Sequence, residues 1–205
     1  MVGDSEMITV IDYKAGNLTS VLKTLRHVGA EPIVTDGDLA LVESAERIIL
    51  PGVGHFAATE RLDSTGLTGS IRAAIARGVP FLGICVGMQW LYAGSTEAPQ
   101  QPGLGQFPES CSRFPEGLEK VPHVGWNSLE IRPGSRLLAH IEPGEFVYFT
   151  HSFKAPVTAD TAAVTHYNEP FAAAVERGNV MGVQFHPEKS GETGLKVLRN
   201  FLNLS

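Results

Sequence analysis

The feature that most constrains the fold is an alternation, in the first half of the chain, of short apolar runs with segments of helical periodicity. Apolar runs of strand length occur at residues 7–11, 47–50 and 80–84. Between them, apolar residues recur at helical spacing in residues 18–28 and 67–75, and Gly29 and Gly78 end these patterns. Strands that alternate with helices form right-handed βαβ units. We therefore predict a mostly parallel central sheet with helices on both faces.

The second half of the chain has a different pattern. Residues 98–108 are rich in proline, glycine and glutamine and are expected to form an exposed loop. Short alternating segments follow, and these predict antiparallel or mixed strands: WNSLEI, EFVYFTHSF, AAVTHY, AAAVE and VMGVQF. Apolar spacing over residues 195–202 indicates a closing helix. The expected organisation is a single α/β domain over residues 7–205, preceded by a disordered N-terminus at residues 1–6.

Composition excludes several classes of function. The net charge of −6 argues against a nucleic-acid partner or an anionic membrane surface. No apolar run reaches the roughly 18–20 residues that span a bilayer, and the first residues lack the basic segment of a signal peptide. Two cysteines are too few for a disulfide framework, and no Cys/His spacing suggests a metal. A reduced, cytoplasmic protein without metal or other cofactor is expected.

The apolar run at residues 80–84 leads into the pattern Gly-x-Cys-x-Gly, with Cys85 at its centre. Glycines on both sides remove Cβ atoms where a chain turns sharply from strand to helix. Such a nucleophile elbow holds its central residue exposed at the carboxyl end of a sheet, next to a helix N-terminus that stabilises a thiolate. The alternative interpretation is a small buried cysteine after a core strand. A nearby base would favour the elbow.

The segment GVQFHPEKSG near the C-terminus supplies that base. Residues 183–185 are expected to form a strand, so that His186 lies at its end. In an extended segment residues i and i+2 point the same way, which places the Glu188 carboxylate beside the His186 ring. A histidine oriented by a carboxylate is suited to accept a thiol proton and return it to a leaving amine. A His-Pro-Glu sequence alone could also be a surface turn, but together with the cysteine elbow it favours a Cys-His-Glu triad.

A third segment, PGVGHF at residues 51–56, follows the buried run at residues 47–50. Its glycines allow backbone N–H groups to approach a ligand or to reorient. A glycine-rich loop after a strand can also hold phosphate, but this one lacks the Lys-Ser/Thr ending and the spacing of a Walker loop.

Taken together these motifs resemble the class I glutamine amidotransferases. IDYKAGNLTS, PGVG, GICVGMQ, VPHVGWN, YFTHSF and HPEKSG occur in order over nearly the whole chain. VPHVGWN and HPEKSG are the discriminating motifs, and they are most similar to the family of glutaminase subunits of imidazole glycerol phosphate synthase. The resemblance implies the class I glutamine amidotransferase fold. It also implies a heterodimer with a (β/α)8-barrel synthase subunit that makes imidazole glycerol phosphate and AICAR in histidine biosynthesis.

The resemblance also implies roles for individual residues. Cys85 would attack the carboxamide of glutamine, His186 would act as general base and then acid, and Glu188 would orient it. The remaining residues form three groups: Gly52, Val53 and Val86 for the oxyanion, Gln89, Thr150, His151, Ser152 and Phe153 for glutamine, and Asn17, Trp126 and Lys189 for the interface with the barrel. Because ammonia released without an acceptor is wasted, the isolated chain is expected to be poorly active, with rotation of the PGVG peptide as the switch.

Two other interpretations remain open at this point. The chain could be a free-standing cysteine hydrolase, similar to a γ-glutamyl hydrolase or a peptidase, or a catalytically silent subunit that only binds a partner. The sequence also departs from the family pattern at His55, where a small residue is more usual, and at Val86 and Trp90, where leucine is expected. None of these departures removes a group of the expected triad.

Overall fold

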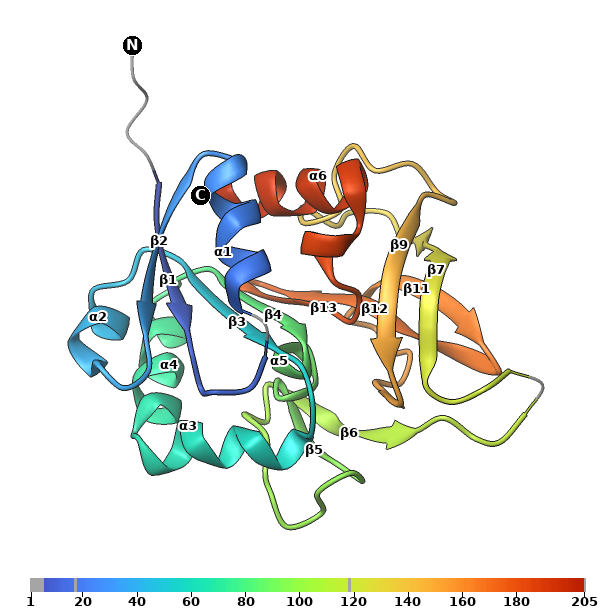
Figure 1. Ribbon diagram of the computed structural model, residues 1–205, viewed down its shortest axis with the longest axis horizontal. Coiled ribbons are helices and arrows are strands. Elements are labelled where there is room, and N and C mark those ends of the chain that lie inside the picture. Colours follow the sequence, from blue (N-terminus) through green and yellow to red (C-terminus); the bar gives the residue numbers. More distant parts are fainter. Residues whose placement is uncertain (1–5, 17, 118, 205) are drawn as a thin grey trace.

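The computed structural model describes residues 6–16, 18–117 and 119–204. At its centre is an eight-stranded sheet with the strand order β2-β1-β3-β4-β13-β12-β11-β8 (Figure 1). Pairing is parallel from β2 to β13 and antiparallel from β13 to β8. The strands, in sheet order, are Ala30–Thr35, Glu6–Ile11, Ile48–Gly52, Phe81–Cys85, Val180–Val183, Glu169–Arg177, Thr161–Tyr167 and Glu130–Ile131. The expected α/β fold with additional antiparallel strands in its C-terminal half is confirmed.

Two smaller sheets complete the strand structure. One has the order β10-β6-β5, formed by Phe153–Lys154, Phe107–Arg113 and Tyr92–Ser95. The other is an antiparallel pair of β7 (His123–Ser128) and β9 (Phe146–His151), in which Trp126 lies opposite Tyr148. Residues directly opposite each other in an antiparallel pair share a face. The β7–β9 sheet therefore has an outer face with Val124, Trp126 and Phe146, all more than half exposed, and an inner face with His123 and His151, which are buried.

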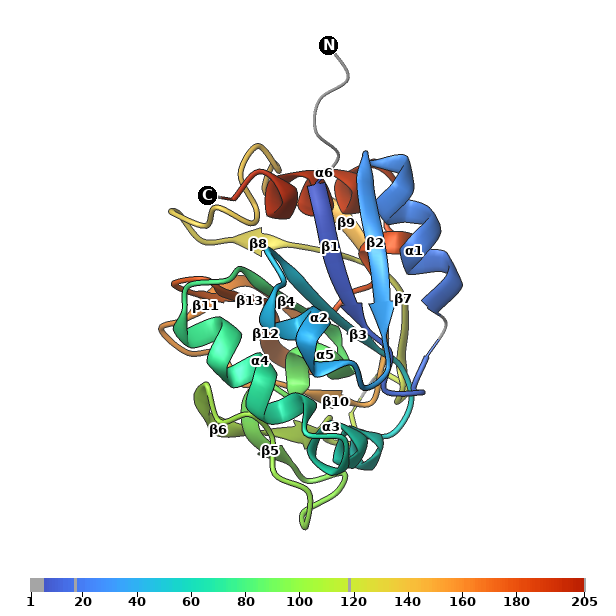
Figure 2. The same ribbon diagram turned by 90° about the vertical axis from the view of Figure 1, so that its left-hand side faces the viewer.

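Helices cover both faces of the central sheet (Figures 1 and 2). On one face lie α1 (Leu18–His27) and α6 (Gly191–Leu202), and on the other α3 (Glu60–Ser64) and α4 (Leu67–Ala76). The structure also contains α2 (Leu39–Glu43) and α5 (Val86–Gln89). Each long helix buries the stripe that its sequence period predicts, for example Ile71 and Ala74 of α4. Burial of a side chain such as Ile71 contributes about 1.5–3 kcal/mol. Among the described residues no helix combines the length and apolar character that crossing a bilayer requires.

Four parts of the fold differ from the sequence-based expectation. Strand β2 was not expected, because Glu31 and Pro32 interrupt its apolar pattern at the edge of the sheet. The proline-rich segment at residues 98–108 is not a wholly exposed loop: Leu104 is buried and Phe107, also buried, begins β6. Strand β13 ends at Val183 rather than at Phe185. β1 begins at Glu6, one residue before the expected start, and residues 1–5 lie outside the described residues.

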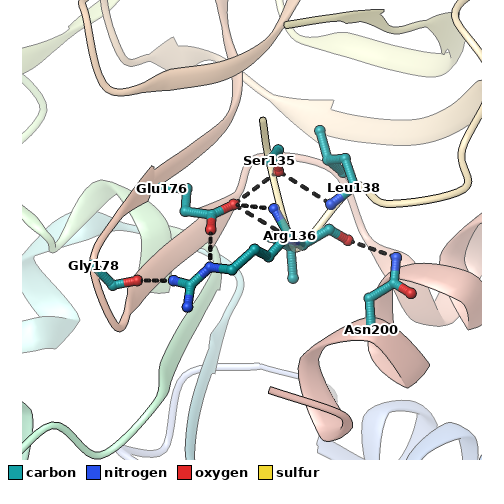
Figure 3. A network of polar contacts seen from close by, with 7 residues as sticks. Ser135, Arg136, Leu138, Glu176, Gly178 and Asn200 are labelled. Carbon is teal, nitrogen blue, oxygen red and sulfur yellow. Dashed lines mark hydrogen bonds and ion pairs between the residues drawn. The ribbon is translucent and has the colours of Figure 1, made fainter. Parts of the chain in front are cut away.

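A polar network around Glu176 ties the C-terminal strands to α6 (Figure 3). The Glu176 carboxylate accepts hydrogen bonds from Ser135 Oγ and the Arg136 N–H, and it pairs with Arg136 Nε at 2.8 Å. The guanidinium of Arg136 also donates to the Gly178 carbonyl. From α6, Asn200 Nδ2 donates to the carbonyl of Leu137 in the same loop. The loop between β8 and β9 is thereby fastened to the end of β12 and to the helix that follows His186 and Glu188.

Candidate active site

Cys85 stands at the corner between β4 and α5, as the elbow pattern predicted, but it is buried there rather than exposed. Its backbone has φ 54° and ψ −110°, a conformation that costs a non-glycine residue on the order of 1–3 kcal/mol. The two flanking glycines make the corner possible. A Cβ on Gly83 would lie 2.4 Å from the Gly87 carbonyl oxygen, and one on Gly87 would lie 1.9 Å from the Leu50 carbonyl oxygen. The strained backbone conformation of Cys85 places its thiol at the carboxyl end of the parallel strands.

The helix after the corner is shorter than the sequence suggested. α5 spans only Val86–Gln89, a single turn, so its dipole is a weak source of stabilisation for a thiolate. Side chains must supply the rest. Gln184 Nε2 lies 3.6 Å from Cys85 Sγ and donates to it. Gln184 was not singled out from the sequence, because one buried glutamine at the end of a strand carries no distinctive spacing.

His186 and Glu188 form the expected pair, although by a different route. Nδ1 of His186 lies 2.8 Å from Glu188 Oε1, and both side chains are buried. Pro187 does not continue an extended segment but begins the 3-10 helix η2 (Pro187–Lys189), and this turn brings the carboxylate back to the ring. Ser190, which sequence reasoning missed, braces the turn: its Oγ donates to the His186 carbonyl and accepts from the Tyr148 N–H.

The electrostatic environment of His186 suits a histidine that is paired with a thiolate. Burial opposes the imidazolium form, but the Cys85 thiol and the Glu188 carboxylate together outweigh it and raise the pKa of His186 to about 10. Nε2 of His186 has no hydrogen-bond partner among the described residues, so it is free to act on the thiol and on a substrate. The pair thus has one nitrogen fixed by Glu188 and the other nitrogen available for proton transfer.

The PGVG segment lies beside the nucleophile. Gly52 ends β3 and stands opposite Cys85 in the parallel register, and Val86 is buried next to it. The Val53 N–H does not point toward the thiol: it donates to the Ala15 carbonyl at 3.4 Å. The Tyr13 hydroxyl occupies the space where a Gly52 side chain would project, and it is buried without a hydrogen-bond partner among the described residues. Burial and the nearby Cys85 raise the pKa of Tyr13.

A cavity of about 200 Å³ adjoins the elbow. All five residues expected to contact glutamine line it, together with Glu97, whose carboxylate accepts a hydrogen bond from the Phe56 N–H. Glu97 was missed because a single acid before a proline-rich segment gives no sequence signal. The full lining is Gly54, Val86, Gln89, Glu97, Pro122, Thr150, His151, Ser152 and Phe153. A second cavity of about 170 Å³ is the one that His186 and Glu188 line, together with Ala15, Gly16, Val53 and Lys189, among others.

The residues expected at the partner interface gather in one region as far as the structure describes them. Trp126 is 55% exposed and packs edge-on against Tyr148, and Lys189 Nζ lies 5.6 Å from the centroid of the Tyr148 ring. Asn17 lies outside the described residues.

The residues that depart from the family pattern, and the second cysteine, have structural explanations. His55 is exposed and accepts the Ala57 N–H at its Nδ1, so it caps the following 3-10 helix η1 (Phe56–Thr59). Trp90 is fully buried against Phe81. Cys111 is fully buried, which raises the pKa of its thiol.

Comparison with known proteins identifies the family of this chain. The family described as glutamine amidotransferase class-I matches residues 9–204. The HisH subunits of imidazole glycerol phosphate synthase from Deinococcus radiodurans and Thermosynechococcus vestitus are 44% and 46% identical, over 95% and 96% of this chain and 92% and 96% of theirs.

Solved structures show the same fold at lower identity. A putative GMP synthase protein from Thermoplasma acidophilum superposes with a TM-score of 0.72 at 22% identity, over 97% of this chain and 92% of that one. PurLQS from Thermotoga maritima superposes with the same TM-score and identity, over 97% and 98%. The chain therefore belongs to the class I glutamine amidotransferases, and within them to the family of HisH subunits of imidazole glycerol phosphate synthase.

Proposed function

We propose that this chain hydrolyses glutamine to glutamate and ammonia at Cys85 and delivers the ammonia to a (β/α)8-barrel synthase subunit. That subunit would use it to make imidazole glycerol phosphate and AICAR in histidine biosynthesis. The observation that carries the proposal is the joint placement of three features. These are the strained Cys85 corner, the buried His186–Glu188 pair at 2.8 Å and the cavity of about 200 Å³ lined by Gln89 and Thr150.

The chemistry follows from these groups. His186 takes the thiol proton, and the thiolate attacks the side-chain carboxamide carbon of glutamine. The imidazolium then protonates the leaving amine, which departs as ammonia and leaves a γ-glutamyl thioester on Cys85. In the second half of the reaction His186 deprotonates a water molecule, which attacks the thioester and releases glutamate. Glu188 holds the ring and stabilises its charged form throughout.

The cavity suits the amino-acid end of glutamine. Among its described lining residues Glu97 is the acidic one, and its carboxylate is placed to pair with the α-ammonium group. The amide nitrogen of Gln89 is used within the protein, since it donates to Phe153 O and Gln184 Oε1. Its carbonyl oxygen is therefore the atom that Gln89 offers to a ligand.

The PGVG segment supports gating by the partner. With the Val53 N–H turned to Ala15, one expected oxyanion donor faces away from the thiol. Loss of one such donor lowers the rate by on the order of 10²–10³. Rotation of the Gly52–Val53 peptide, which glycine permits at low steric cost, would return the donor to the site. We therefore expect weak activity in the isolated chain and strong stimulation in the complex.

The outer face of the β7–β9 sheet supports partner binding. Val124, Trp126 and Phe146 are exposed on one face, and apolar side chains grouped on a surface can mark a protein–protein interaction site. The second cavity is lined by both His186 and Lys189, and Lys189 lies against Tyr148, so this cavity is where we propose that ammonia leaves the site.

The test measures glutamine hydrolysis by the chain alone and with a cognate barrel synthase and its nucleotide substrate, beside Cys85→Ala. Stimulation that disappears in Cys85→Ala is the expected result. High activity without a partner would instead indicate a free-standing hydrolase. Partner binding without hydrolysis in either condition would indicate a silent subunit.

A further inference from the structure

A buried histidine pair on the inner face of the β7–β9 sheet takes no part in the proton transfers of the proposed mechanism, although His151 lines the cavity proposed for glutamine. His123 Nδ1 lies 3.1 Å from His151 Nε2, and His151 Nδ1 lies 2.8 Å from the Phe153 carbonyl oxygen. The ring of His123 stacks between Phe149 and Tyr167, with centroid distances of 4.8 and 4.0 Å. Burial lowers the pKa of His123 to about 4 and that of His151 to about 3, so both rings are neutral at physiological pH.

A neutral histidine carries one N–H, and this fixes the direction of every bond in the pair. A carbonyl oxygen only accepts, so His151 must carry its proton on Nδ1. Its Nε2 is then an acceptor, so His123 must also carry its proton on Nδ1. The remaining His123 Nε2 accepts from Asn127 Nδ2 at 3.4 Å. Asn127 is oriented independently, because its Oδ1 accepts the Ser128 N–H and its Nδ2 donates to the His166 carbonyl.

The same constraint extends from Phe153 to the nucleophile. The Phe153 carbonyl also accepts from Gln89 at 2.9 Å, which identifies the Gln89 atom there as nitrogen. That nitrogen lies 3.0 Å from Gln184, so the Gln184 atom there must be the oxygen. The Gln184 amide nitrogen is thereby directed at Cys85 Sγ, 3.6 Å away. The side chains of His123, His151, Gln89, Gln184 and Cys85 are buried, and the Phe153 carbonyl belongs to the backbone of β10.

We propose that Gln184 holds the Cys85 thiolate by donating its Nε2–H to the sulfur, and that the Phe153 carbonyl fixes the orientation of Gln184. This carbonyl accepts from Gln89 on one side, which orients Gln89 and through it Gln184, and from His151 on the other side, which sets the tautomers of His151 and His123. Gln184 contacts the reacting atom, and the other members are positioning residues. The two branches meet at the Phe153 carbonyl, and the histidine branch reaches β7, whose opposite face carries Val124 and Trp126. The inference rests on the proposed role of Cys85 as nucleophile.

The first test reads the tautomers directly by ¹H–¹⁵N correlation of the histidine side chains in the full-length protein. Both His123 and His151 are expected in the Nδ1–H form at neutral pH. His123→Phe and His151→Phe assign the two signals, and through-bond correlation assigns them if a variant does not fold. An Nε2–H form at either ring would overturn the role of the Phe153 carbonyl as the common acceptor that sets both tautomers.

The second test uses Gln184→Glu, which keeps the acceptor for Gln89 and replaces the donor to sulfur by a carboxylate oxygen. The measurement is alkylation of Cys85 by iodoacetamide as a function of pH, followed by peptide mass. His186 and Tyr13 also face the thiol and are unchanged in the variant. The pH midpoint of Cys85 alkylation is expected to rise by at least about one pH unit in Gln184→Glu. At any pH below both midpoints, the variant should therefore be alkylated about tenfold more slowly than the parent. The control is Gln100→Glu, the same substitution at an exposed position, and it should leave the alkylation midpoint unchanged.

An unchanged midpoint in folded Gln184→Glu would refute the role of Gln184. If that variant does not fold, Gln184→Met removes the donor without adding charge, and a smaller upward shift is expected, with no shift again refuting the role. Neither test needs glutamine hydrolysis. Failure here with an active glutaminase would remove this inference alone, whereas an inactive protein with the expected tautomers would count against the proposed function.

Discussion

Gly87 stands where the elbow crosses β3, and replacing it with alanine isolates the steric requirement of that crossing. A Cβ at this position would lie 1.9 Å from the Leu50 carbonyl oxygen and 2.9 Å from its carbon. Relaxed carbon contacts are about 3.5–4.0 Å. One of the two backbones must therefore move by more than an ångström. Both belong to the centre of the molecule, where β3 pairs with β4, so no side-chain rotation can relieve the clash.

Overpacking of this kind typically costs about 1–3 kcal/mol and occasionally more, and the lack of a flexible neighbour places Gly87→Ala at about 3 kcal/mol or above. In a chain of this size this corresponds to a fall in Tm of about 6–12 °C. Displacement of Cys85 by such a distance should also lower glutaminase activity about 10²-fold. Thermal unfolding followed by circular dichroism, and the coupled glutaminase assay, measure the two effects.

The matched control is Gly69→Ala, the same substitution at an exposed position of α4 where an added Cβ meets nothing within 4 Å. There alanine should stabilise the protein by about 0.5–1 kcal/mol, because it removes the conformational freedom of glycine in a helix. If Gly87→Ala were as stable and active as the parent, the close crossing of the elbow and β3 would be wrong.

Three further predictions concern single groups. Tyr13→Phe should raise the free energy of unfolding in urea by about 1 kcal/mol, because it removes a buried hydroxyl without a partner among the described residues; a loss of stability would mean that the hydroxyl is bonded. The pKa of His186 is about 10, above its ordinary value of about 6.5. Protonation of His186 therefore stabilises the folded state. This contribution is fully present below about pH 6.5 and is lost as the pH rises through about 10. An NMR titration should show the midpoint fall in Cys85→Ala, and an unchanged midpoint would exclude the thiolate as a cause. Glu176→Ala should cost about 2–3 kcal/mol, since its carboxylate serves several donors, whereas Glu192→Ala, in an exposed pair, should cost about 0–1 kcal/mol in the same denaturation assay.

The parts of the fold that could be predicted from the sequence are those whose burial has a regular period. The strands β3 and β4 are buried at every position and read as continuous apolar runs, and α4 and α6 bury regular stripes. Strand β2 could not be recognised, because an edge strand buries few side chains and Pro32 interrupts the apolar pattern of its sequence. β6 was hidden for a similar reason, since only some of its positions face the interior.

The site divides in the same way. Cys85, His186 and Glu188 could be found because glycine and proline mark tight turns around them. Gln184, Glu97 and Ser190 could not, because each acts through a tertiary contact between elements distant in the chain. His123 illustrates the limit most clearly: its partner His151 lies across the β7–β9 pairing, and only that register brings the rings together.

The most direct test of the proposed mechanism is to trap its covalent intermediate. The chain, with a cognate barrel synthase and its nucleotide substrate, would be incubated with glutamine, quenched in acid and analysed by peptide mass. We predict a γ-glutamyl adduct on Cys85, present at a higher level with the partner than without it and absent in Cys85→Ala. Turnover of glutamine with no adduct on Cys85, or with hydrolysis intact in Cys85→Ala, would contradict the mechanism.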